Sequence, residues 1–359
     1  MMGASPSPLR PGSTIGIVGG GQLGRMLAIA AAQLGYKCHI YAPDEAPPAG
    51  EVAAFCTRGD FDNEAALAKF AAAVDVATYE FENIGAGPLK SLTDGVALHP
   101  PVRALEVAQD RLSEKNFVAA LGGRPAPFRQ VSSRDDLQRA LSEIGTPAIL
   151  KTRRFGYDGK GQARIFAPNE ADQAWEAVRG APSVLEGMVK FDSEFSILLC
   201  RSSTGKTVFW DAPCNIHKAG ILDRCIVPGQ LPQGQVTEAR ALAQKVADAL
   251  DYVGVLTLEF FVGADGPVFN EMAPRVHNSG HWTIEGAVTS QFENHIRAVC
   301  GLPLGSTSMI GSGATMDNLI GEDADRWLEI LSDPKACLHL YGKGDARPGR
   351  KMGHVTHLK

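Results

Sequence analysis

The first hundred residues alternate between short apolar runs and helix-like stretches, with glycine at the turns between them. Three of the apolar runs predict strands, at residues 14–18, 37–41 and 74–81. An Ala-rich stretch at 25–34 predicts a helix that ends at Gly35, a residue type that commonly caps helix C-termini. Because strands joined through helices pair in parallel, this region predicts a parallel sheet with covering helices, which is an α/β fold.

The pattern changes after the His99-Pro100-Pro101 segment. Helices are predicted at 110–121 and 236–250, and strands at 149–152, 184–186 and 194–200. The apolar runs 253–262 and 267–272 flank an Asp-Gly turn and predict a hairpin, so the middle of the chain is expected to be α+β. A Leu-Pro-Leu-Gly segment at 302–305 precedes a short tail. We predict three domains, at 1–110, 111–302 and 303–359.

Bulk composition excludes several classes of protein. Lys and Arg number 35 against 40 Asp and Glu, and the formal net charge of −5 argues against a broad nucleic-acid-binding surface. No apolar run approaches the roughly 18 residues that a membrane helix needs, and residues 1–14 lack the apolar core of a signal peptide. Seven cysteines without a C-x-x-C motif indicate a reducing compartment. We therefore expect a cytoplasmic protein that binds neither nucleic acid nor membrane.

The glycine-rich segment Gly19–Gly24 allows two interpretations. It satisfies the G-x-G-x-x-G pattern between a strand and a helix, and Asp44 follows twenty residues after Gly24, as in dinucleotide-binding folds. That pattern favours an NAD-dependent dehydrogenase. Asp44, however, lies in the loop after the second strand, where it need not face a ribose. The alternative is a tight turn that lets helix and sheet pack closely.

A second glycine-rich segment, residues 155–161, carries positive charge. Three of its seven residues are glycine, Lys160 lies within it and Lys151 precedes it. Backbone N–H groups and ammonium groups in such a loop can surround a triphosphate. The segment therefore predicts a phosphate-binding flap, and an exposed hairpin without a ligand is the alternative.

The predicted hairpin places two glutamates in apolar surroundings. If Pro267 belongs to a loop at 263–267, residue 262 pairs with 268, and Glu259 lies directly opposite Glu271. Two facing carboxylates repel each other, and Mg²⁺, which bridges carboxylates and phosphates, would remove the conflict. Two solvated edge glutamates are the alternative.

Polar residues follow the second of these strands in quick succession. They are Arg275, His277, Asn278, Ser279 and His281. An arginine offers a fixed fork for a carboxylate-like anion, and so many donors beside a metal-binding strand predict a pocket for a small anion near the γ-phosphate. A surface loop with ordinary hydrogen bonds is the alternative.

Together these motifs resemble the ATP-grasp ligases, and most closely the 5-(carboxyamino)imidazole ribonucleotide synthase family. The glycine flap, a glutamate on one strand, Asn270-Glu271 on the next and a following arginine are the ATP-grasp features. Five strings narrow the resemblance and occur in family order, at Gly20–Met26, Asp110–Leu112, Gly156–Gln162, Asn270–Trp282 and Arg347–His354. The resemblance implies an ATP-grasp fold with an N-terminal Rossmann-like pre-ATP-grasp domain and a small C-terminal domain.

The resemblance also implies roles for individual residues. ATP would be held by Arg111, Lys151, Gly156, Tyr157, Asp158, Gly159, Lys160, Gly161, Gln162, Glu186, Gly187, Met188, Val189, Glu194, His217, Asn270 and Glu271. Mg²⁺, or Mn²⁺ in its place, would be held by Glu259 and Glu271. Bicarbonate and carboxyphosphate would be held by Arg275, His277 and Asn278. The ribonucleotide would be contacted by Gln22, Leu23, one of Glu80 and Glu82, Tyr157, Asp158, Ser279, His281, Lys343 and Arg350.

The implied reaction is the ATP-dependent carboxylation of 5-aminoimidazole ribonucleotide with bicarbonate in purine biosynthesis. In the implied mechanism, bicarbonate attacks the γ-phosphorus to give carboxyphosphate while Lys151 and magnesium neutralise charge. Asp158 would accept the proton of the attacking amine. We expect a homodimer whose product passes to the carboxyaminoimidazole ribonucleotide mutase.

One position departs from the wider superfamily. Ala273 stands where many ATP-grasp enzymes have the asparagine of an E-x-N-x-R motif, and this narrows the resemblance to the carboxyaminoimidazole branch. The formate-using glycinamide ribonucleotide transformylases of the same superfamily are the nearest alternative. From other classes, the NAD-dependent dehydrogenase and a nucleotide-binding regulator without chemistry stay open, although the regulator has no need of an anion pocket.

Overall fold

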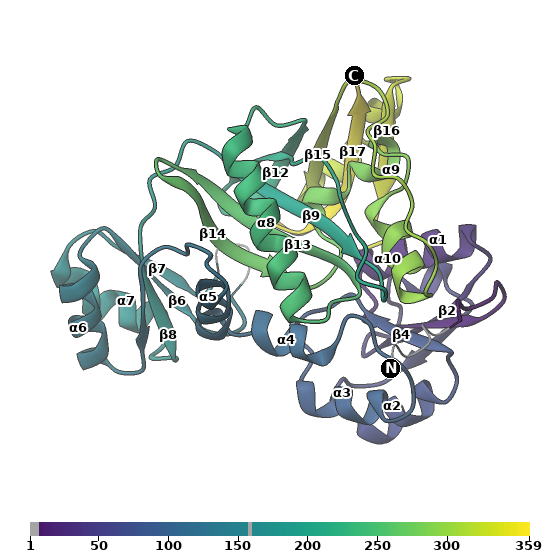
Figure 1. Cartoon of the computed structure of the whole chain (residues 1–359), viewed down its shortest axis with the longest axis horizontal. Helices are drawn as coiled ribbons and strands as arrows, with labels where there is room; N and C mark the ends of the chain where they lie inside the picture. Colours follow the sequence, from purple (N-terminus) through teal and green to yellow (C-terminus); the bar gives the residue numbers. More distant parts are fainter. Residues whose placement is uncertain (1–6, 157–159) are drawn as a thin grey trace.

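The computed structural model describes residues 7–156 and 160–359, and this described part contains three sheets (Figure 1). Tyr157, Asp158 and Gly159 of the predicted flap lie outside it. None of the helices in the described ranges has both the length and the apolar character required to span a membrane. All seven cysteines are free thiols.

The N-terminal region forms the parallel sheet that the alternating pattern predicts. Its strands, in spatial order, are β3 (Phe55–Arg58), β2 (Lys37–Ala42), β1 (Thr14–Val18) and β4 (Val76–Tyr79). Its helices are η1 (Gly50–Val52), α1 (Gln22–Gln33), α2 (Glu64–Ala71), α3 (Ala86–Thr93) and α4 (Val102–Ala108). Helix α1 begins three residues earlier than predicted, because the glycine turn runs directly into it with Gly21 as the N-cap.

A smaller, antiparallel sheet follows, and it confirms the predicted α+β character of the middle of the chain. Its strands, in spatial order, are β5 (Phe128–Val131), β8 (Ser183–Gly187), β6 (Ala148–Thr152) and β7 (Gln162–Ile165). The single turn η2 (Pro168–Glu170) leads into α7 (Ala171–Ala177), which packs with α6 (Arg134–Ile144) on this sheet. Leucine and alanine side chains of α6 and alanine side chains of α7 pack on the apolar side chains of the strands in this small core.

The largest sheet has nine strands within the described residues. Its path is β14-β13-β9-β11-β12-β15-β17-β16, with β10 paired to β9. The bounds are β9 (Glu194–Arg201), β10 (Thr207–Phe209), β11 (Cys214–Lys218), β12 (Ile221–Val227), β13 (Gly254–Gly263), β14 (Gly266–Ala273), β15 (Ala314–Ile320), β16 (Ala336–Leu340) and β17 (Lys351–Leu358). Residues 303–359, predicted as a separate domain, continue this sheet because β15 pairs with β12. The domain boundaries stay a prediction.

The helices beside the large sheet decide which of its side chains face the site. They are α5 (Arg111–Ala120), α8 (Gln233–Ala249), α9 (Thr283–Gly286), α10 (Gln291–Val299) and α11 (Trp327–Leu331), with the turns η3 (Asn278–Gly280) and η4 (Gly321–Arg326). Leu256, Leu258 and Phe260 of β13 belong to the core that α8 closes. Because successive strand residues point to opposite faces, Glu259 points away from α8. This alternation explains how a carboxylate is accommodated in an otherwise apolar strand.

Candidate active site

The turn of the β13–β14 hairpin is tighter than the predicted loop at 263–267. Val262 pairs with Pro267 and not with Val268, so the predicted loop was wrong. The physical reason is the place of β14 at the edge of the sheet. An edge strand tolerates proline, because one side of its backbone makes no ladder hydrogen bonds.

A β-bulge in β14 nevertheless brings the two predicted carboxylates together. Beyond Phe260 the pairing shifts by one residue, and Asn270 and Glu271 together lie opposite Glu259. Burial and the neighbouring charge of Glu271 raise the pKa of Glu259 to about 7. The two glutamates therefore repel each other, as expected of the facing carboxylates that the sequence predicts.

Arg111, at the start of α5, pairs with the second of these glutamates. Its Nη1 lies 3.2 Å from Glu271 Oε2, and its Nη2 donates to the carbonyl of Gly156 at 3.1 Å. The Glu271 side chain is 44% exposed, and the burial of the rest would raise its pKa, but Arg111 and Lys151 outweigh that burial and the pKa is lowered. Glu271 thus stays ionised near pH 7, whereas Glu259, with a pKa of about 7, is only partly ionised there.

Glu186 on β8 is held by two lysines. Its Oε2 lies 3.0 Å from Lys151 Nζ and 3.2 Å from Lys115 Nζ. Burial works against the charge of Glu186, but Lys151 and Lys115 prevail and lower its pKa to about 2. Lys115 also donates to the carbonyl of Asn270 at 3.3 Å, so it ties the small sheet to the β13–β14 hairpin.

Lys115 and its neighbour Glu114 are functional candidates that the sequence did not reveal. Lys115 is fully buried, and Glu114 accepts the Met272 N–H at 2.6 Å. Burial raises the pKa of Glu114 to about 8. In the sequence both look like ordinary charged residues of an amphipathic helix, and only the packing of α5 on the hairpin distinguishes them.

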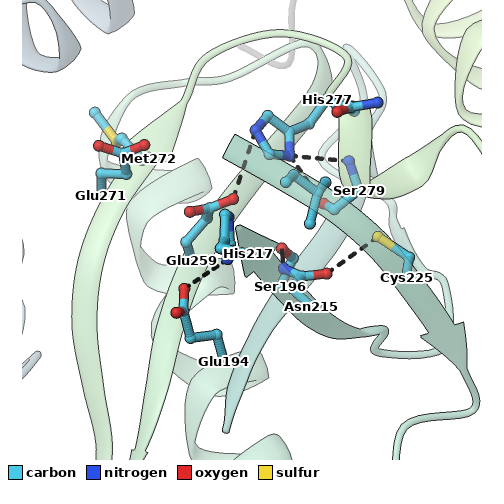
Figure 2. A network of polar contacts seen from close by, with 12 residues as sticks. Glu194, Ser196, Asn215, His217, Cys225, Glu259, Glu271, Met272, His277 and Ser279 are labelled. Carbon is cyan, nitrogen blue, oxygen red and sulfur yellow. Dashed lines mark hydrogen bonds and ion pairs between the residues drawn. The ribbon is translucent and has the colours of Figure 1, made fainter. Parts of the chain in front are cut away.

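Glu194 and His217 lie beside Glu259 (Figure 2). Ser196 pairs with Glu259 across β9 and β13, and Glu194, two residues away, therefore faces the same side of the sheet. Glu194 Oε2 lies 2.9 Å from His217 Nδ1. Burial would lower the pKa of His217, but Glu194 and Glu259 raise it overall. The structure thus brings these two predicted nucleotide contacts to the paired carboxylates.

The base of the flap and the C-terminal end of β8 adjoin the ion pair of Lys151 and Glu186. Thr152 N–H donates to the Gly161 carbonyl at 2.8 Å, and Gln162 pairs with Lys151, which fixes the base of the flap. Lys160 is exposed. At the end of β8, the N–H groups of Gly187 and Met188 donate to Pro127 and Pro147 carbonyls at 2.8 and 3.0 Å, and Val189 is half-buried.

Residues 275–281 form the polar loop after β14, named the anion loop here for the anion pocket that its sequence predicts. Arg275 Nη2 lies 2.8 Å from Glu82 Oε2, so the loop is joined to the N-terminal region. His277 Nε2 lies 3.6 Å from Glu259 Oε1, and Figure 2 shows the ring directed toward that carboxylate. The loop therefore adjoins the paired glutamates. Burial lowers the pKa of His277 well below 6.5, and Arg275 adds to the shift.

Ser279 and His281 are buried in the same loop. Ser279 Oγ lies 2.8 Å from Nδ1 of His277, and the His281 ring lies 5.0 Å from that of His354 on β17. Burial lowers the pKa of His281 well below 6.5. The loop thus presents neutral histidines beside a single arginine.

Glu80 occupies the glycine turn at the start of α1. It accepts the N–H groups of Gly21 at 2.8 Å and Gly24 at 3.4 Å. A Cβ added at Gly19 would lie 2.7 Å from Glu80 Oε1. The helix N-terminus, where a dinucleotide would place its pyrophosphate, therefore already holds a carboxylate, which argues against the dehydrogenase interpretation. Of the two glutamates predicted as ribonucleotide contacts, Glu80 is hydrogen-bonded to the glycine turn and Glu82 is paired with Arg275.

The remaining predicted substrate residues flank this turn. Leu23 is buried in the core, and Gln22 is partly exposed at the first turn of α1. Lys343 donates to the Lys351 carbonyl at 2.9 Å and is close enough to Glu80 to oppose the rise of its pKa that burial causes. Arg350 donates to the Asp345 carbonyl at 3.1 Å. The structure thus brings Lys343 to the glycine turn, while Arg350 is engaged within its own loop.

Three family models match the chain. They are the ribonucleotide synthetase preATP-grasp domain over residues 13–109, the ATP-grasp domain over 116–292 and the phosphoribosylaminoimidazole carboxylase C-terminal domain over 314–359. The chain is 49% identical over 354 residues to the N5-carboxyaminoimidazole ribonucleotide synthase of Brucella melitensis, with 98% of each sequence covered.

Solved structures agree with these matches. An N5-carboxyaminoimidazole ribonucleotide synthetase in complex with ADP superposes with a TM-score of 0.95 at 39% identity, covering 99% of this chain and 94% of that one. The Aspergillus clavatus synthase, solved with ADP and 5-aminoimidazole ribonucleotide, gives 0.90 at 29% identity, covering 97% and 94%. They support the ligase over both the transformylase and the dehydrogenase. The chain belongs to the N5-carboxyaminoimidazole ribonucleotide synthases, a family of ATP-grasp ligases of purine biosynthesis.

Proposed function

We propose that the described site joins bicarbonate to the amine of 5-aminoimidazole ribonucleotide through carboxyphosphate, at the expense of ATP. The observation that carries this proposal is the distance of 3.6 Å between His277 Nε2 and Glu259 Oε1, which places the anion loop beside the paired carboxylates Glu259 and Glu271. Phosphoryl transfer requires the acceptor anion next to the γ-phosphate. The Aspergillus clavatus relative, solved with ADP and 5-aminoimidazole ribonucleotide, supports the same substrates.

Glu259 and Glu271 would hold Mg²⁺, and Mn²⁺ would suit the same oxygen ligands. Among the described residues no group of three Asp, Glu, His or Cys side chains is arranged to hold a metal. A magnesium ion carried in with ATP needs few protein ligands, because phosphate oxygens and waters complete its shell. Burial and the charge of Glu271 raise the pKa of Glu259, and a cation between the two carboxylates would relieve their repulsion. When bound, the ion would supply positive charge against the phosphates.

The cations around Glu186 and Glu271 would hold the triphosphate. Lys151 pairs with Glu186 and Arg111 with Glu271, and the flap, including Lys160, would close over the triphosphate. Glu194 and His217, which are already paired, would contact another part of the nucleotide. As ATP binds, Lys151 would turn from Glu186 to the transferring phosphate, while Lys115 keeps Glu186 neutralised.

The anion loop would hold bicarbonate and then carboxyphosphate. Arg275 provides the fixed charge, and His277 and Asn278 would add uncharged donors in a buried setting where such donors act strongly. Ser279 and His281 line the same loop. For Arg275 to receive the anion, Glu82 must give up its ion pair, and it would then be available to the ribonucleotide.

The ribonucleotide would lie between the glycine turn and the C-terminal strands. Lys343 and Arg350 would meet its phosphate, and Gln22 and the turn that Glu80 holds would border it. The predicted roles of Tyr157 and of Asp158 as the proton acceptor fall outside the described residues and remain predictions. A homodimer, a cytoplasmic location and transfer of the product to the carboxyaminoimidazole ribonucleotide mutase are proposed on the family resemblance alone.

One assay tests the proposed reaction. ADP release is measured with 5-aminoimidazole ribonucleotide plus bicarbonate, and separately with glycinamide ribonucleotide plus formate. We expect substrate-dependent ADP only from the first pair, together with loss of the free amine. Absence of ADP from the first pair, or its release from the second, would overturn the proposal.

A further inference from the structure

The anion loop is fixed from outside by two buried side-chain amides. Gln291 comes from α10 and Asn318 from β15, and both are almost completely inaccessible to solvent. Neither belongs to the motifs that the sequence argument singled out. Both reach the loop at the positions where its proposed bicarbonate residues stand.

Asn318 forms a reciprocal amide pair with Asn278. Asn278 Nδ2 donates to Asn318 Oδ1 at 2.9 Å, and Asn318 Nδ2 donates back to Asn278 Oδ1 at 2.8 Å. Asn318 Nδ2 also donates to the Leu222 carbonyl at 2.8 Å. A carbonyl only accepts, so Leu222 fixes which end of the Asn318 amide is the nitrogen. That orientation in turn fixes the amide of Asn278.

Gln291 holds the neighbouring residue of the loop by its backbone. Its Oε1 accepts the His277 N–H at 2.9 Å, and its Nε2 donates to the His277 carbonyl at 2.6 Å. The ring is set by a further bond, since the Ser279 N–H donates to His277 Nδ1 at 3.3 Å. Nδ1 is therefore the acceptor of the neutral ring, and Nε2 carries the proton on the side that faces Glu259 (Figure 2).

The two amides act on consecutive residues and come from different elements, helix α10 and strand β15. Gln291 immobilises the backbone of His277, while Asn318 immobilises the side chain of Asn278. A loop that must bind an anion as small as bicarbonate gains affinity when its donors are already ordered, because little conformational freedom is then lost on binding.

We propose that Asn318 is a positioning residue for bicarbonate. It orders the side chain of Asn278, which would bind the anion, and does not itself touch the substrate. This inference rests on the proposed role of the anion loop. It gives strand β15, in the region that matches the C-terminal family model, a part in the first half-reaction. Loss of the pair leaves the loop intact but free to adopt other conformations, so the affinity for bicarbonate falls while the nucleotide site is untouched.

The test variant is Asn318→Leu, which keeps the approximate size and removes all three side-chain hydrogen bonds of Asn318, two with Asn278 and one with the Leu222 carbonyl. Steady-state ADP release gives KM for bicarbonate, KM for ATP and kcat in the presence of 5-aminoimidazole ribonucleotide. We expect KM for bicarbonate to rise about five- to tenfold, the effect of about one ordinary hydrogen bond. KM for ATP should change less than twofold.

A matched control comes from another buried asparagine. Asn294 on α10 accepts the Gly305 N–H at 2.7 Å and donates to the Gly305 carbonyl at 3.3 Å, so it also closes a loop with its amide. Asn294→Leu should lower the thermal midpoint comparably and leave KM for bicarbonate at the wild-type value. If both variants raise KM for bicarbonate equally, the effect is general loosening and the inference is wrong.

Two further outcomes are distinguishable. If the wild-type protein shows no bicarbonate-dependent ADP release, the proposed function fails and the inference fails with it. If the wild type is active but Asn318→Leu lowers kcat alone, with KM for bicarbonate unchanged, the positioning role is excluded while the function stands. Should Asn318→Leu fold poorly, Asn318→Ser, which keeps a small polar group, provides the same KM comparison.

Discussion

On the nucleotide side of the site, buried ionic side chains face one another, whereas the histidines of the anion loop are buried without charge. Lys115, Lys151 and Glu186 compensate each other within 3.2 Å, and the pKa of Glu186 falls to about 2. Burial lowers the pKa of His277 and His281 well below 6.5, and side-chain amides hold the loop that carries them.

This difference follows from what each side is proposed to bind. A triphosphate brings several negative charges, so its site needs permanent cations, and buried cations of this kind require carboxylate partners such as Glu186. Bicarbonate carries a single charge, which Arg275 alone can match. Neutral donors add direction without adding charge. Single substitutions of buried charged groups, of a buried neutral histidine and of an exposed ion pair test this explanation.

The largest effect is expected from Glu271→Gln. The variant removes the ionised member of the carboxylate pair and the partner of Arg111, and kcat should fall at least about a hundredfold. Steady-state ADP release measures the loss. Glu238→Gln is the matched control, since Glu238 pairs with Arg124 on the surface and should retain wild-type turnover. Undiminished turnover of Glu271→Gln would remove the metal role from the proposal.

Next in size is the effect of Lys115→Met on stability. The Lys115 side chain is 1% exposed and its loss leaves a buried carboxylate with one cation fewer, so we expect the free energy of unfolding to fall by about 3 kcal/mol. Urea denaturation with tryptophan fluorescence measures it. Stability equal to that of the wild type would mean that Lys151 alone compensates Glu186, and the two-lysine description would be wrong.

A smaller, pH-dependent effect is expected from the neutral histidines. Burial and the charge of His99 lower the pKa of His295 to about 3, and His295 Nε2 lies 2.8 Å from Thr78 Oγ1. The unfolded chain takes up a proton below about pH 6.5 while the native ring stays neutral. The contribution of the neutral His295 ring to the free energy of unfolding is therefore complete above pH 6.5. It is lost as pH falls toward 3, by about 1.4 kcal/mol per pH unit.

The variant His295→Gln isolates that contribution. Urea midpoints between pH 7 and pH 5 should decline less steeply than in the wild type, by the equivalent of one proton, because glutamine does not titrate. Its absolute stability should be lower at every pH, since the bond to Thr78 is weakened. An unchanged slope would show that His295 is not among the histidines that remain neutral.

The smallest effect is expected where ion pairs are exposed. Arg134 pairs with Asp172 and Glu176, and all three side chains are about half exposed or more. Arg134→Gln should leave the thermal midpoint and turnover unchanged, because water and salt screen such pairs. A marked loss of stability would contradict the view that burial distinguishes the cluster around Glu186 from other charges of the protein.

The sequence predicted those elements whose pattern is local. The strand at 14–18, the glycine turn and the apolar run with Glu259 were recognisable from periodicity, and the ligand motifs are contiguous strings. The register of the hairpin was not, because both the tight turn and the bulge depend on the edge position of β14. The bulge restores the proximity of Glu259 and Glu271, and the alternation of apolar and polar residues along a strand does not predict a bulge.

Long-range partners escaped prediction for a different reason. Lys115 pairs with Glu186 and Asn318 with Asn278, both more than thirty positions away along the chain. The residues that flank Lys115 and Asn318 in the sequence form no recognisable motif. The same holds for Glu82, whose pairing with Arg275 spans the first and middle regions. Short strands without strong alternation, such as β11 and β16, were also missed, because their pairing in the sheet gives them their conformation.

The order of strands at the far end of the large sheet bears on how the chain folds. β17 lies between β15 and β16, although it follows both along the chain. Until β17 docks, β16 has no strand to join, and β15 can pair with β12 while its other edge stays open. An open edge is a place where two incompletely folded chains can pair with each other. We expect docking of β17 to be the step that protects the edge of β15 from aggregation.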